Sequence, residues 1–132
     1  MSITIDGITG EKMARTILKD IFKVENIFQL DWIVYKNGIY YAVEVKHKEL
    51  FMPPPFVGQG LDIRQVKARM KLYADKDIRC LFLVISKQEE IVYWQWLDVL
   101  EQTKYFDTKN KIRVYDIKEF HRVGKIEKLI AI

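Results

Sequence analysis

Polar and apolar residues alternate with period two in two neighbouring segments that a short polar turn separates. The first segment ends in QLDWIVY, the turn is KNG, and the second segment begins IYYAVEVKHKE. Asn-Gly between β-branched and aromatic runs favours a type I′ hairpin, because both central residues of that turn take positive φ. The pattern therefore predicts a hairpin with Asn37 and Gly38 as its two-residue loop.

Counting outward from this loop sets the register of the hairpin. The count places Asp31 opposite Glu44, with Lys46 two residues further along the second strand. Because side chains alternate between the faces of a strand, these three residues share one face. The opposite face is expected to join the core, and it carries Leu30, Trp32, Val34, Tyr41, Val43 and Val45.

Helical spacing of apolar residues predicts three helices, from Thr9 to Val24, from Leu61 to Ala74 and from Leu97 to Gln102. The apolar stripe of the first helix comprises Met13, Ala14, Ile17, Leu18, Ile21 and Phe22. The buried stripe of the second helix is expected to comprise Ile63, Val66, Met70 and Tyr73.

Further strands are predicted at positions 79–86, 91–97 and 111–117, the first of them central because CLFLVI is continuously apolar. Val92, Trp94 and Trp96 would face the core from the second of these strands. Three prolines and two glycines predict an irregular loop over 49–60. The tail after position 117 is weakly helical in pattern, and the chain is expected to be one α/β domain, residues 1–132, with a central mixed sheet flanked by helices.

Composition narrows the function classes. The chain has 132 residues, a hydrophobic content of 49%, a formal net charge of +4 and a pI near 9.1, which suits a polyanionic partner. No apolar run approaches the roughly 20 residues that span a bilayer, and the first residues lack a secretory apolar region, so we expect a cytoplasmic protein without membrane contact. The single cysteine, Cys80, lies in an apolar run and is expected to be a buried thiol.

Two carboxylates directly opposite each other in a sheet repel, at a cost of a few tenths to about 1 kcal/mol. A divalent cation would turn that repulsion into ligand charge, and Mg²⁺ prefers carboxylate and water oxygens. Asp31, Glu44 and the nearby Lys46 are thus a minimal set for metal-assisted phosphodiester hydrolysis, in which the lysine holds or deprotonates the attacking water.

A charged face on a solvated hairpin is the alternative interpretation. The spacing of an acid and a lysine two residues later occurs three times, at Glu44 and Lys46, at Asp107 and Lys109, and at Asp116 and Lys118. Only the first instance lies on a well-indicated strand with a second acid opposite.

Glu11 lies at the edge of the apolar stripe of the first helix. It either faces the hairpin and helps to hold a metal or its water, or complements the helix dipole, which is worth about 0.3 to 1 kcal/mol.

The second predicted helix carries a basic ridge of Arg64, Lys67 and Lys71, with Gln65 and Arg69 beside its apolar stripe. These residues either contact phosphate or form a solvated charged surface.

Taken together, the chain resembles the PD-(D/E)xK nuclease superfamily, over roughly Gly7 to Ser86. The resemblance consists of an acid in the first helix (Glu11), Asp31 on a strand, Glu44-Val45-Lys46 on the next strand, and then a helix and a buried strand. Leu30 stands where the proline of the motif would be, and no separate strand is evident before the strand of Asp31.

This resemblance implies a restriction-endonuclease-like core and a magnesium-dependent DNA endonuclease in which Mn²⁺ substitutes for Mg²⁺. Asp31, Glu44 and the carbonyl of Val45 would bind the metal, Lys46 would act on water, and Gln65 would be a further site residue. The segment is most similar to the Holliday-junction resolvase branch, which implies branched DNA as substrate and a homodimer.

Five basic side chains are the candidate DNA contacts: Lys48, Arg64, Lys67, Arg69 and Lys71. A restriction- or repair-type nuclease acting on duplex DNA or ends, and a non-catalytic nucleic-acid-binding module, stay open as alternatives.

Overall fold

The structure is a computed structural model that describes residues 8–23, 30–47, 49–86 and 89–125, with the backbone alone for residues 8–12 and 125. In chain order the elements are α1 (Ile8–Phe22), β1 (Trp32–Lys36), β2 (Ile39–Lys46), β3 (Gly58–Asp62), α2 (Ile63–Lys76), β4 (Arg79–Ser86), β5 (Ile91–Trp96), α3 (Leu97–Leu100), β6 (Tyr105–Asp107), β7 (Ile112–Asp116), the 3-10 turn η2 (Ile117–Glu119) and β8 (His121–Lys125).

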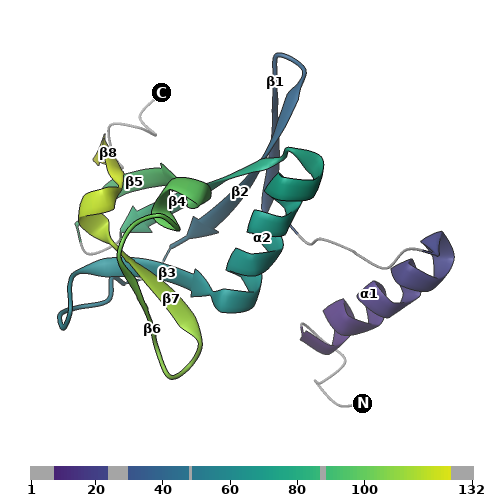
Figure 1. Ribbon diagram of the computed structural model, residues 1–132, viewed down its shortest axis with the longest axis horizontal. Coiled ribbons are helices and arrows are strands. Elements are labelled where there is room, and N and C mark those ends of the chain that lie inside the picture. The colour runs from purple at the N-terminus through teal and green to yellow at the C-terminus, as the bar shows by residue number, and fades with distance from the viewer. Residues whose placement is uncertain (1–7, 24–29, 48, 87–88, 126–132) are drawn as a thin grey trace.

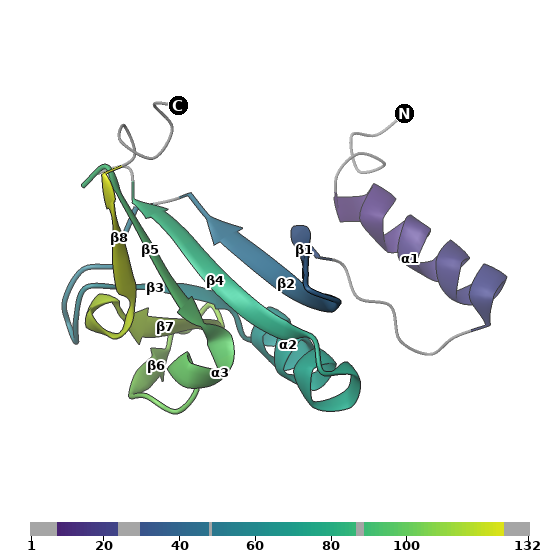
Figure 2. The ribbon, with the colours of Figure 1, turned by 90° about the horizontal axis from the view of Figure 1, so that it is seen from above.

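Two sheets organise the domain. The larger sheet has the strand order β1-β2-β4-β5-β8. It is mixed, because β2 and β4 run parallel while the other neighbouring strands pair antiparallel. The smaller is antiparallel, with the order β3-β7-β6. Helix α2 and the smaller sheet lie on one side of the larger sheet (Figures 1 and 2). The predicted fold class, a single small α/β domain with a mixed sheet, is confirmed.

The core fills the space between the larger sheet and this layer. Cys80, Phe82 and Val84 of β4 point inward and are at most 2% exposed, and Val66 of α2 and Tyr115 of β7 are fully buried with them. Cys80 is a free, buried cysteine, as predicted, and burial raises the pKa of its thiol to about 12.

The faces of strands β1 and β2 are the reverse of those predicted, although Leu30, which precedes β1, packs against the core as expected. Ala42 and Glu44 are 0% and 2% exposed on the inner face, whereas Trp32 and Val34 on the outer face are 66% and 46% exposed. The reason is the handedness of the crossover connection from β2 to the parallel strand β4. Such connections are right-handed, so chirality decides which face of the sheet the crossover helix covers, and a period-two sequence pattern does not reveal that face.

The same reversal holds for β5. Trp94 and Trp96 are half-buried on the outer face, while Ile91 and Tyr93 are buried on the inner face. The expectation that the tryptophans face the core was therefore wrong.

Helix α2 turns only part of the expected stripe toward the core. Val66 is buried as predicted and Met70 packs against the core. Arg69 and Leu72 are also buried, whereas the predicted Ile63 and Tyr73 are half-buried.

The predicted loop over 49–60 was partly wrong, because its last residues begin strand β3. Gly58 and Gly60 permit this strand to lie close to β7: an added Cβ would lie 2.2 Å from the carbonyl oxygen of Tyr115 at Gly58, and 2.4 Å from that of Arg113 at Gly60. The glycines thus mark a close backbone approach. The weakly helical tail was also wrong, because residues 121–125 form β8.

Helix α1 stands apart from the rest of the domain, beyond the side that carries β1, in both views (Figures 1 and 2). The structure gives it nearly the predicted bounds. Its apolar stripe remains exposed, with Met13, Ile17, Leu18, Ile21 and Phe22 between 38% and 66% exposed.

Candidate active site

The hairpin of β1 and β2 forms as the sequence predicts. Asn37 and Gly38 have φ of 51° and 82°, the positive values of a type I′ turn. The register runs from Lys36 opposite Ile39 to Trp32 opposite Val43. The next pair in this register would be Asp31 with Glu44.

Asp31 is held at the start of β1 by a hydrogen bond across the hairpin. The backbone N–H of Val45 donates to Oδ2 of Asp31 at 3.1 Å. The side chain is exposed and lies near enough to Glu44 to act on its pKa. The predicted acidic pair is therefore brought together.

Glu44 is buried beneath helix α2, where it meets a basic residue. Its side chain is 2% exposed and forms an ion pair with the guanidinium of Arg69, which is 5% exposed. Nε of Arg69 donates to Oε1 of Glu44. Since an unpaired buried charge is strongly destabilising, each partner makes the burial of the other tolerable.

The pKa of Glu44 is raised above its ordinary value. Burial is the largest cause, because it penalises the charged form; Arg69 opposes the rise, and the carboxylate of Asp31 adds to it. Arg69 lowers the pKa of Glu44 more than Asp31 raises it, so the net rise comes from the burial of Glu44.

Lys46 and Gln65 lie toward the same end of the sheet. Lys46 is half-buried on the face of β2 that carries Glu44 and pairs in register with Val84 of β4. Gln65 is half-buried in the first turn of α2, four residues before Arg69.

The direction of α2 brings these two residues to a similar level. The helix ends just before β4 begins, so its first turn lies toward the end of β4 that pairs with Lys46. Four helical residues rise about 6 Å, and two strand residues about 7 Å. Gln65 is therefore displaced from Arg69 about as far as Lys46 is from Glu44.

Arg69 is the residue that the sequence interpretation assigned differently. It was expected to contact phosphate, but at 4% exposed it lies in the core beneath the sheet, so that assignment is corrected. Two signals were available: Arg69 lies three residues from both Val66 and Leu72, and a buried Glu44 needs a cation.

The exposed ridge on α2 exists as predicted, with carboxylates beside it. Nε of Arg64 lies 3.3 Å from Oδ1 of Asp62, and Nζ of Lys71 lies 2.8 Å from Oδ2 of Asp75. Lys67 is exposed between them. Exposed pairs of this kind contribute little to stability, so phosphate oxygens can compete for the basic groups.

Two predicted residues fall outside what the structure describes. Lys48 lies outside the described residues, and for Glu11 only the backbone is described, within α1. Helix α1 as a whole stands away from the hairpin (Figure 2).

The oxygen donors suit a hard cation in kind. Asp31 and Glu44 supply two carboxylates, and Mg²⁺ commonly binds through one or two, with waters completing its shell. A cation bound here would share Glu44 with Arg69. Within residues 13–23, 30–47, 49–86 and 89–124, no group of three or more His, Cys, Asp or Glu side chains gathers around a possible metal position.

Comparison with protein-family models finds no match to this chain, and comparison with curated proteins finds none either. The described helices include none long and apolar enough to cross a membrane.

Replacing Arg69 with Met should destabilise the fold by about 3 to 5 kcal/mol at neutral pH, because Glu44 then stays buried without its counter-charge. The loss should shrink as pH falls. The pKa of Glu44 is higher in the folded state than its ordinary value of 4.5, so protonated Glu44 stabilises the fold relative to ionised Glu44. This contribution to the free energy of unfolding is complete below pH 4.5 and is lost as the pH rises through the pKa of the folded state.

Urea unfolding between pH 4 and 8 measures both effects. Arg64→Met is the matched control, because Arg64 pairs with Asp62 at the surface and exposed pairs contribute little to stability. Equal and pH-independent losses for the two variants would contradict the assigned ion pair.

Proposed function

We propose that the protein is a magnesium-dependent DNA endonuclease that hydrolyses phosphodiester bonds in branched DNA and works as a homodimer. The observation that carries this proposal is the convergence of Asp31 and Glu44 across the hairpin, with Lys46 on the same face of β2. Acids directly opposite each other repel, and a divalent cation held by both would turn that repulsion into ligand charge.

Each residue has a role that follows from its position. Asp31 and Glu44, with the carbonyl of Val45, would hold Mg²⁺, which when bound polarises the scissile phosphate and acidifies a water. Lys46 would orient the attacking water or take its proton. Arg69 fixes the carboxylate of Glu44 in one orientation. Gln65 presents an amide that both donates and accepts.

The exposed ridge supports recognition of DNA shape. Arg64, Lys67 and Lys71 lie on the solvent side of α2, and such side chains neutralise phosphates without reading bases. Helix α2 is also the element that covers Glu44. The DNA backbone of the substrate would therefore run along α2, the helix that covers Glu44.

The pairing of Glu44 with Arg69 favours a second candidate function. This ion pair gives the buried acid a structural explanation that needs no metal. On that interpretation the protein would be a nucleic-acid-binding module without catalysis, and the ridge alone would carry its activity.

A panel of DNAs incubated with Mg²⁺ separates these candidates. We expect four-way junctions to be cut by paired nicks near the branch, and linear duplex and single strands to be cut poorly. Cleavage of duplex or ends without preference for junctions would favour the restriction- or repair-type alternative. Binding without cleavage under any metal condition would favour the non-catalytic module.

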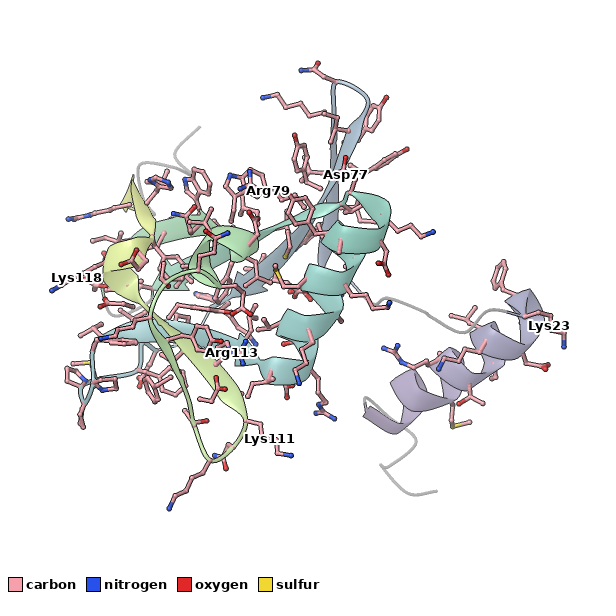
Figure 3. The ribbon with its side chains drawn as sticks, viewed as in Figure 1. Lys23, Asp77, Arg79, Lys111, Arg113 and Lys118 are labelled. Carbon is pink, nitrogen blue, oxygen red and sulfur yellow. The ribbon has the colours of Figure 1, made fainter. Side chains whose placement is uncertain are left out.

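Lys46→Ala should reduce junction cleavage by at least about a hundredfold, as expected for loss of a proton-transfer group, with DNA affinity nearly unchanged because distributed phosphate contacts carry binding. Lys118→Ala is the matched control, since Asp116-Ile117-Lys118 repeats the acid-to-lysine spacing at an exposed turn (Figure 3). Single-turnover cleavage and binding by anisotropy measure the two effects. Parallel loss of affinity and cleavage would refute the role of Lys46.

Asp31→Asn should abolish the stabilisation that Mg²⁺ or Mn²⁺ gives the wild-type protein. It should leave metal-free stability unchanged or slightly higher, because the asparagine amide keeps an oxygen for the Val45 N–H and relieves the repulsion on Glu44. A metal at 100 times its Kd adds about 2.7 kcal/mol, which thermal unfolding resolves.

Asp77→Asn serves as the control for this substitution. Asp77 caps α2 with φ of 58°, a conformation that asparagine also tolerates, and it lies on the surface (Figure 3). A metal effect that survives in Asp31→Asn would exclude Asp31 as a ligand.

A further inference from the structure

The outer face of the larger sheet is an unusually apolar surface. It is the face opposite α2, and its side chains are half-buried or exposed: Trp32, Val34, Tyr41, Val43, Val45, Leu81, Leu83, Ile85, Val92, Trp94 and Trp96. Patches of this kind that span several strands mark interaction sites on soluble proteins.

A second apolar surface lies on helix α1. Its stripe of Met13, Ile17, Leu18, Ile21 and Phe22 faces solvent, although helices of this length depend on packing for most of their stability. One chain thus carries an amphipathic helix and an apolar sheet face. Within the described part of the chain, the stripe of α1 does not pack on the outer face of the larger sheet.

The position of α1 indicates which chain's sheet its apolar stripe could cover. The helix lies beyond β1, on the side of the sheet away from α2 (Figure 2). β1 is an edge strand of the larger sheet, and its Trp32, Ile33, Val34 and Tyr35 are between 46% and 66% exposed. A second sheet placed next to this edge would bring its outer face to the side of the sheet on which α1 lies.

We propose that two copies of the chain exchange their α1 helices, so that α1 of each packs on the outer face of the sheet of the other. This deepens the homodimer of the proposed function and rests on it only for the expectation of two copies. The exchange is self-complementary, since each copy gives one helix and receives one, as twofold symmetry requires.

The buried area supports a stable dimer. Five large apolar side chains that each lose about 100 Å² give about 500 Å² per stripe. Two stripes and the two faces that they cover then total about 2,000 Å², which lies at the upper end of a standard interface.

A disulfide experiment distinguishes exchange from packing within one chain. Ile17→Cys and Val43→Cys are made as separate proteins in a Cys80→Ala background, mixed after unfolding and refolding together, and oxidised. We expect a disulfide between the two different chains, together with a dimer mass by light scattering. A monomer mass, or absence of that disulfide, would overturn the proposal.

A charge placed within the stripe provides an independent test. Ile21→Asp should convert the dimer to a monomer, whereas Lys19→Asp on the polar side of α1 should leave it dimeric. If Ile21→Asp stays dimeric, α1 exchange is excluded. These measurements need neither metal nor DNA, so an absence of nuclease activity would leave their outcome intact.

Discussion

The ion pair between Glu44 and Arg69 constrains how helix α2 sits on the larger sheet. Both side chains are almost fully buried, and the cost of taking two charges from water is recovered only when the geometry is good. The helix therefore has little freedom to rotate or slide, because either movement would separate the charges. Val66 and Leu72, which share the buried side of α2 with Arg69, are fixed against β4 by the same restriction.

The charges around this pair bear on the chemistry proposed for it. Asp31 and Glu44 carry two formal negative charges, and Arg69 and Lys46 carry two positive ones, so the group is neutral without a metal. A divalent cation alone would leave an excess of positive charge in a partly buried place, where that excess is costly. A phosphodiester offsets one of those charges. Metal and DNA should thus favour each other's binding, which is the coupling that a nuclease needs and a simple structural ion pair lacks.

Spacing between near neighbours was enough to predict the hairpin, the bounds of β4, and helices α1 and α2 to within about two residues. The Asn37-Gly38 turn set the register that brings Asp31 beside Glu44. What could not be predicted depends on tertiary geometry. The handedness of the crossover decides which face of β2 the helix covers, so the buried and exposed sides were reversed. Arginine is usually a surface residue, and Arg69 lies in the core only because Glu44 of β2 faces it across the contact between α2 and the larger sheet.

This reversal of faces also links the site to assembly. If the apolar face of the hairpin had packed under α2, the acids would be solvated and no further cover would be needed. Instead the inner face holds the charged pair, and Trp32 at 66% exposed remains on the outer face. At about 25 cal/mol per Å², covering about 500 Å² of that face corresponds to about 12 kcal/mol before the costs of association, which is comparable to the net stability of a small domain. The chain that buries Glu44 therefore gains from a second helix over its apolar side, and α1 is the described element with an apolar stripe to supply it.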